Sequence, residues 1–162
     1  MEETYYNMEI NKASLKAISR RKYAVKILKF LSENDDEAFY LSELAKQLNI
    51  CDVVVRQNMD KLEAAGLVRR TQGNPIQRNI VYYEVKNKDA AMYVIEKFRR
   101  YVGFQLARHV TERKTEQQLR KDIEVDCKRF KISVDEGIQC LNLCPSIAKE
   151  RQYDTTIYYR KP

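Results

Sequence analysis

The sequence of 162 residues is poor in the residue types that build catalytic and flexible segments. It has a single histidine, four glycines and three prolines. No nucleophile or catalytic motif surrounds the histidine, His109, and no glycine-rich phosphate-binding loop occurs. We therefore expect no enzymatic activity and no flexible linker within the chain, and we interpret His109 as a cation at the C-terminal end of a helix.

Long apolar runs are also missing from the sequence. No uninterrupted apolar stretch approaches the roughly 18 residues of a membrane-spanning helix. The acidic, tyrosine-bearing N-terminus lacks the apolar core of a signal peptide. These absences predict a soluble, cytoplasmic protein without a membrane partner, and its length suits one domain or one small domain with an appendage.

Positive charge, by contrast, is in excess. Thirty lysines and arginines face 23 aspartates and glutamates, which gives a net charge of +7. The excess is spread over both halves of the chain, with no basic tail. A basic balance favours a nucleic-acid partner, but a charged surface also keeps an ordinary helical protein in solution. Charge alone leaves both interpretations open.

Two short helices in quick succession are predicted between Leu41 and Gly66. Ser42 is placed to cap the first helix and Asp52 the second. Gly66 closes the second helix, because glycine adopts a left-handed conformation at no steric cost. Each helix has apolar residues at helical spacing, which predicts one buried stripe per helix. The stripes are Leu44, Ala45 and Leu48 in the first helix, and Val55, Met59 and Leu62 in the second.

A basic β-hairpin follows these helices. Residues 67–71 and 79–85 are β-prone, and the segment between them holds the strongest turn residues of the chain. Arg69, Arg70 and Arg78 lie on its arms and tip, from which cations can reach a phosphate backbone. Two helices followed by such a hairpin predict a winged helix-turn-helix.

These segments resemble the winged-helix transcription factors of the ArsR and MarR type. The run Leu-Glu-Ala-Ala-Gly-Leu-Val-Arg, within Met59–Arg70, is similar to the end of their recognition helix, and Val-Tyr-Tyr-Glu-Val at Val81–Val85 resembles their second wing strand. The resemblance covers about Leu15 to Arg108. It implies a mainly α fold with a small β-hairpin wing (α+β), a recognition helix at about 52–65 in the major groove of double-stranded DNA, and a wing at 67–85 on the backbone or minor groove.

The periodicity divides the chain into an N-terminal arm (1–13), the winged helix-turn-helix (14–88) and a C-terminal region (89–162). The first helix is expected over 14–32, and residues 39–41 form a β-bridge to the wing. The C-terminal region is predicted to hold a long helix and a small helical extension, with a helix over 115–129, a capping box at Ser133 and a β-prone end.

The long helix from Asp89 to about His109 has a broad apolar seam of nearly heptad spacing. We expect this seam to form a homodimer, because a two-fold axis would place two recognition helices about one DNA turn apart. Burial under the C-terminal segment of the same chain is the alternative. The expected dimer residues are Ala91, Ile95, Phe98, Val102 and Leu106.

The helical wheel of the second short helix leaves its polar residues on the open faces. Glutamine and asparagine pair with adenine, arginine with guanine or phosphate, and valine with a thymine methyl group. The predicted contacts from this helix are Val53, Val54, Arg56, Gln57, Asn58 and Lys61. Arg69, Arg70, Gln77, Arg78 and Asn79 are the predicted contacts from the wing.

The four cysteines allow a further interpretation. Cys140 and Cys144 are one helical turn apart and, with Cys127, have the donor chemistry of a metal or iron–sulfur site. Small thiols packing a helical core are the commoner arrangement, and the cysteine pair that ArsR metal sensors often carry is missing from Ser42–Leu48. We expect no cofactor. Three functions stay open: a dimeric DNA-binding transcriptional regulator, a winged-helix protein-interaction module, and a redox- or metal-gated regulator.

Overall fold

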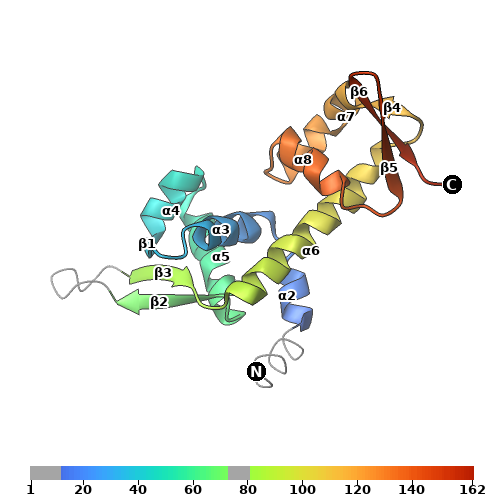
Figure 1. Ribbon diagram of the computed structural model, residues 1–162. Coiled ribbons are helices and arrows are strands. Elements are labelled where there is room, and N and C mark those ends of the chain that lie inside the picture. Colours follow the sequence, from blue (N-terminus) through green and yellow to red (C-terminus); the bar gives the residue numbers. More distant parts are fainter. Residues whose placement is uncertain (1–11, 73–80) are drawn as a thin grey trace. The chain divides into compact units, whose positions relative to one another are not determined.

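The computed structural model describes residues 12–72 and 81–162 (Figure 1). The chain forms two compact units, Met1–Lys97 and Phe98–Pro162. One long helix, α6 (Lys88–Leu106), contributes residues to both units. Among the described residues, no helix is both long and apolar enough to cross a membrane.

Two helices occupy the segment of the first unit, from residue 12 onward, in which the sequence predicted one helix. These are α2 (Lys12–Ile18) and α3 (Lys22–Glu33). Between them the Ser19 hydroxyl donates a hydrogen bond of 2.6 Å to the carbonyl oxygen of Lys16. A serine that bonds back to the preceding turn competes with continued helix, so the expectation of a single helix over 14–32 is wrong.

The predicted helix-turn-helix is formed by α4 (Leu41–Leu48) and α5 (Asp52–Ala64). Asn49 ends α4 in a left-handed conformation, and Gly66 follows α5 with a φ of 77°. The predicted caps are wrong by one or two positions, since Tyr40 and Cys51 are the N-cap residues and neither makes a side-chain cap hydrogen bond. The apolar stripes meet α3 in a core that includes Ile27, Leu28, Leu44, Val55, Met59 and Leu62, all fully buried.

The two strands of the wing, β2 (Val68–Gln72) and β3 (Val81–Val85), belong to an antiparallel sheet that also contains β1 (Phe39–Tyr40). The strand order of this sheet is β1-β3-β2. Phe39 pairs with Tyr83, so the predicted bridge between residues 39–41 and the wing is confirmed. Helices α3, α4 and α5 with this sheet form a winged helix-turn-helix, and the expected fold class is confirmed.

The second unit contains a sheet as well as the expected helices. After α6 come the 3-10 helix η1 (Ala107–His109), β4 (Lys114–Thr115), α7 (Glu116–Arg129), α8 (Val134–Leu141), β5 (Ile147–Gln152) and β6 (Thr155–Arg160). The strand order is β4-β6-β5. The predicted helices and the β-prone end are present, and the sheet that the end joins was not predicted. Strand β5 could not be predicted from the sequence, because it is an edge strand and its run Lys149-Glu150-Arg151-Gln152 has no apolar alternation.

Close backbone contact holds the helices of the second unit together. A Cβ added at Gly103 would lie 2.1 Å from the carbonyl oxygen of Cys140, so α6 and α8 approach one another at a position that only glycine allows. The Thr115 side chain and Gln118 form a capping box at the start of α7. The Ser133 side chain accepts a hydrogen bond from the Glu136 amide, as the sequence predicted for α8.

Candidate nucleic-acid interface

The exposed face of α5 carries most of the residues that the sequence assigned to DNA contact. Val53 is 60% exposed. Arg56, Gln57 and Lys61 are exposed, and Val54 is half-buried. The face begins one residue after the N-terminus of α5, where the helix dipole favours a negatively charged ligand. It combines a cation, an amide and an apolar side chain within about two helical turns.

Asn58 does not belong to this face. It is 4% exposed, and its amide donates to the carbonyl oxygen of Val54 at 2.7 Å. Its side-chain oxygen accepts a hydrogen bond from Arg21 Nε at 3.4 Å. The expectation that Asn58 lies on an open face is wrong, because it occupies the side of α5 that faces the start of α3. Asn58 ties these two helices together.

Arg56 is the cation best placed to meet a ligand. It makes no hydrogen bond or ion pair with any residue in the ranges 12–72 and 81–162. Its stripe on α5, which also contains Asp52 and Asp60, lines an open hollow of about 480 Å³ between α5, the start of α4 and the sheet. The other residues that line the hollow are Tyr40, Leu41, Ser42, Arg70, Val81 and Tyr83.

The arginines of the wing arms are engaged within their own unit. Arg69 Nε lies 2.6 Å from Glu84 Oε1, and Arg70 Nε lies 2.6 Å from Glu63 Oε2. The hydrogen bond to Glu63 raises the pKa of Arg70, which also lies over the Tyr83 ring at 5.7 Å from its centroid. Both arginine side chains remain more than half exposed. A phosphate would have to compete with these carboxylates, but exposed ion pairs of this kind are weak.

Three wing residues of the predicted site, Gln77, Arg78 and Asn79, lie outside the described residues.

The expected dimer seam is buried within the chain itself. Ala91, Ile95, Phe98, Val102 and Leu106 are each 8% exposed or less. Within the second unit, the Phe98 ring meets the Phe130 ring edge-on with the centroids 6.4 Å apart. The expectation that these five side chains face a second copy is therefore wrong, since burial by the chain's own residues has used the apolar surface.

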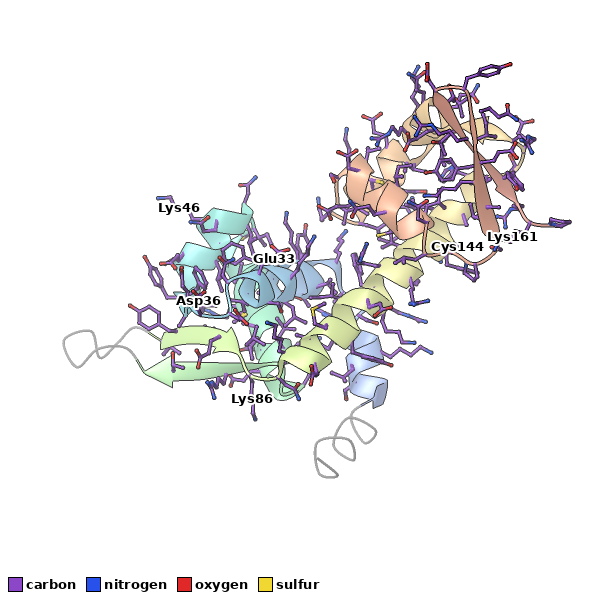
Figure 2. All side chains as sticks on the ribbon, viewed as in Figure 1. Glu33, Asp36, Lys46, Lys86, Cys144 and Lys161 are labelled. Atoms are coloured by element: carbon purple, nitrogen blue, oxygen red, sulfur yellow. The ribbon has the colours of Figure 1, made fainter. Side chains whose placement is uncertain are left out.

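The three C-terminal cysteines are core residues of the second unit. Cys127, Cys140 and Cys144 are buried. Burial raises the pKa of the Cys127 thiol to about 11, so this thiol is protonated at neutral pH. Cys144 lies between α8 and β5, with its Sγ 3.2 Å from Ser146 Oγ (Figure 2). Within the described part of the chain, no group of three or more histidine, cysteine or acidic residues is arranged to hold a metal ion.

Sequence reasoning missed a buried carboxylate in the second unit. Asp126 is 4% exposed and bonds to Arg108, His109 and Arg129. The hydrogen bond from His109, followed by that from Arg108, holds the pKa of Asp126 below its usual value. The available signal was the spacing, because Asp126 falls three residues after Ile123 and seven after Leu119, on the buried stripe of α7. These ion pairs connect η1 to α7, and none of their residues belongs to the predicted DNA-contact set.

Residues 18–75 match the family model of Rrf2, described as an iron-dependent transcriptional regulator. No curated protein matches the chain. Similar solved structures include reduced HlyU from Vibrio cholerae N16961, with 20% identity, 65% of this chain and 99% of that chain covered, and a TM-score of 0.37. A mutant of MarR from E. coli, complexed with operator DNA, has 17% identity, 88% of each chain covered and a TM-score of 0.43. The transcriptional regulator BldR from Sulfolobus solfataricus is 22% identical, with 79% of this chain and 94% of that chain covered and a TM-score of 0.42.

The residues of this chain do not fit an iron centre. Protein-bound iron is held mainly by thiolates and imidazoles. The matched segment contains Cys51 as its one cysteine and has no histidine. The remaining cysteines are buried in the second unit, where the Cys127 thiol stays protonated. The likeness to the regulator family therefore extends to the winged helix and not to a metal site.

Proposed function

We propose that the chain is a sequence-specific regulator of transcription that binds double-stranded DNA through α5 and the wing. One observation carries the proposal: α5 of a winged helix-turn-helix exposes Arg56, Gln57 and Lys61, and Arg56 has no hydrogen-bond or ion-pair partner among the residues described. The match of residues 18–75 to a transcriptional-regulator family supports it. The net charge of +7 favours the same ligand. Such a regulator acts on DNA in the cytoplasm.

In this proposal α5 enters the major groove, where some of its side chains contact bases and others contact the phosphate backbone. Gln57 presents an amide donor and acceptor that fit adenine, and Arg56 presents a planar fork that fits guanine or a phosphate. Lys61, one turn further along, neutralises the backbone, and Val53 contacts a thymine methyl group. Arg69 and Arg70 exchange their carboxylate partners for phosphates when DNA is bound.

Selection of bound sequences from a random DNA pool, followed by binding assays of three variants, tests the proposal. Arg56→Ala and Gln57→Ala should relax the preference at individual base positions, each by about 1–3 kcal/mol. Lys86→Ala removes an equal charge just after β3, beyond the C-terminal end of α5 and not on its N-terminal half, and should leave the preference unchanged (Figure 2). A chain that binds every sequence equally, with or without Arg56, would contradict sequence reading.

The proposal includes a homodimer on a palindromic site, formed by side chains other than the buried seam. The large apolar side chains that α6 leaves exposed are Met92, at 52%, and Phe104, at 70%. Light scattering at micromolar concentration should give the mass of two chains, and Phe104→Glu should reduce it to one. Val125→Glu on α7, where the valine is 72% exposed, is the matched control.

A protein-interaction module is the second candidate, and the pairing of Arg69 and Arg70 within their own unit favours it. A salt titration separates the two functions. DNA binding through several phosphates falls steeply as salt rises, with a slope of about −0.9 per phosphate in a double logarithmic plot. An interaction module would show weak or no DNA binding at physiological salt.

A further inference from the structure

The second unit repeats the order of elements of the first. In the first unit, α3, β1, α4, α5, β2 and β3 follow one another along the chain. In the second, the end of α6 with η1 is followed by β4, α7, α8, β5 and β6. In both sheets the short first strand pairs with the last strand, giving the orders β1-β3-β2 and β4-β6-β5. Residues 98–160 therefore form a second winged helix, with α8 at the position of α5 and the β5–β6 hairpin at that of the wing.

Helix α8 is unsuited to reading DNA. It has eight residues, contains no lysine or arginine, and carries Asp135 and Glu136 in its first turn. Asp135 is paired with Arg120 at 2.7 Å, so this helix also draws in a neighbouring cation. Helix α5 also has an acidic residue in its first turn, Asp52, but Arg56 and Lys61 follow it, whereas α8 has no cation to offset its two carboxylates near phosphates. Any nucleic-acid contact of this unit must come from another element.

The β5–β6 hairpin carries free positive charge. Lys149 and Arg151 are two residues apart on β5 and so lie on one face of the strand. Both are exposed, and neither makes an ion pair or hydrogen bond with a residue that the structure describes. The carboxylate between them, Glu150, is bound to Arg113 and to Gln152. Arg69 and Arg70 of the first wing are paired with carboxylates, which a phosphate would have to displace. Lys149 and Arg151 of the second hairpin have no such carboxylate partners among the described residues.

The hairpin is anchored, and its tip presents an aromatic ring. Arg160 on β6 donates hydrogen bonds of 2.9 and 2.7 Å to the carbonyl oxygens of Val110 and Ala107. At the tip, Tyr153 is fully exposed and has a φ of 56°. A bulky residue in the left-handed region is strained, and glycine or asparagine is the usual residue in so tight a turn. Strained residues of this kind cluster at functional sites.

We propose that the β5–β6 hairpin is a second DNA contact. Lys149 and Arg151 bind phosphates of the duplex, and the Tyr153 ring packs into the groove beside them. This contact adds affinity without base reading, because lysine and arginine at phosphates carry no sequence information. It rests on the proposed function, in which DNA is the ligand of the first unit. One chain then touches the duplex at two places.

The test measures DNA affinity of the full chain against salt for the variant Lys149→Ala/Arg151→Ala. We expect weaker binding to a selected sequence and to random duplexes by the same factor, and a salt slope reduced by about 1.8, the value for two phosphates. Lys121→Ala/Lys128→Ala removes two exposed lysines from α7 and is the matched control. Equal losses in both variants, or no loss in the first, would overturn the proposal.

A second variant separates binding from folding. Tyr153→Gly should raise the melting temperature by a few degrees, since glycine relieves the left-handed strain. It should also weaken DNA binding, because the contact between the ring and the groove is lost. Unchanged affinity would remove Tyr153 from the contact. A parent chain that binds no duplex refutes the proposed function and the hairpin contact together, whereas binding lost in Arg56→Ala but kept in Lys149→Ala/Arg151→Ala refutes the hairpin alone.

Discussion

Asp126 Oδ2 lies 2.6 Å from His109 Nε2, so the one histidine of the chain is bound to a buried carboxylate. Arg108 and Arg129 each approach the same carboxylate at 2.9 Å. The carboxylate joins η1 to the last turn of α7, and the side chains of Arg108 and Arg129 remain more than half exposed. His109, expected as a cation at a helix end, has a specific partner instead.

This cluster predicts acid sensitivity of the second unit. The pKa of Asp126 is lowered in the folded chain, so its contribution to stability is present above the unfolded value of about 3.9 and is lost as the pH falls through the folded value. Asp126→Asn should lower the free energy of unfolding by about 2 kcal/mol at pH 7. Thermal melts at pH 7 and pH 3 test this, and the difference between parent and variant should shrink at pH 3.

Neighbouring residues on α5 should behave in opposite ways. Asn58→Ala removes a buried amide that bonds to Val54 and Arg21, and should cost about 1–2 kcal/mol of stability with the base preference intact. Gln57→Ala should change the base preference and leave the melting temperature unaltered. Chemical denaturation and sequence selection on the same two variants provide the comparison. A base preference altered by Asn58→Ala alone would restore Asn58 to the reading face.

The contact between α6 and α8 predicts a severe effect of a single methyl group. Gly103→Ala places a Cβ 2.1 Å from the Cys140 carbonyl oxygen, which is backbone and cannot rotate away. We expect the free energy of unfolding to fall by about 3 kcal/mol, which is the upper end of the range for overpacked cores. Gly66→Ala is the control, because a Cβ there meets nothing within 4 Å and only the φ of 77° is unfavourable. The Gly66→Ala variant should lose about 1 kcal/mol of its free energy of unfolding.

Thiol labelling distinguishes the packing role of the cysteines from a redox or metal role. Cys51 is exposed, whereas Cys127, Cys140 and Cys144 are buried. Native protein should therefore take up one maleimide group rapidly, and the other thiols should react only after unfolding. Mass spectrometry over a time course records the result. Rapid labelling of Cys127 at neutral pH would contradict a thiol whose pKa burial raises to about 11.

Periodicity and turn chemistry were sufficient to predict the helix-turn-helix and the wing strands of the first unit. Val55, Met59 and Leu62 repeat at helical spacing, and all three are fully buried in α5. A wheel of one helix cannot predict which polar residue the neighbouring helix covers. Asn58 is buried because Arg21, 37 residues earlier in the chain, reaches it. That contact is set by tertiary packing.

The second unit was harder to predict because its signals are split between strands and charges. The segment Lys149–Gln152 is entirely polar, since β5 is an edge strand and buries little. Tyr158 on the central strand β6 is 2% exposed, and one buried aromatic does not make a period of two. The broad apolar surface of α6 was recognised, and the chain's own residues bury the seam, which was the alternative to the expected dimer.

Helix α6 supplies side chains to both units without an intervening loop. A gene fragment cut inside α6, away from the boundary between Lys97 and Phe98, would deprive one unit of part of its own core, such as the buried residues Val94 or Val102. Either unit keeps all of its own core only when the cut falls at that boundary, inside the helix. Because a helix and not a loop joins the two units, a protease that cuts exposed loops should release no intact half.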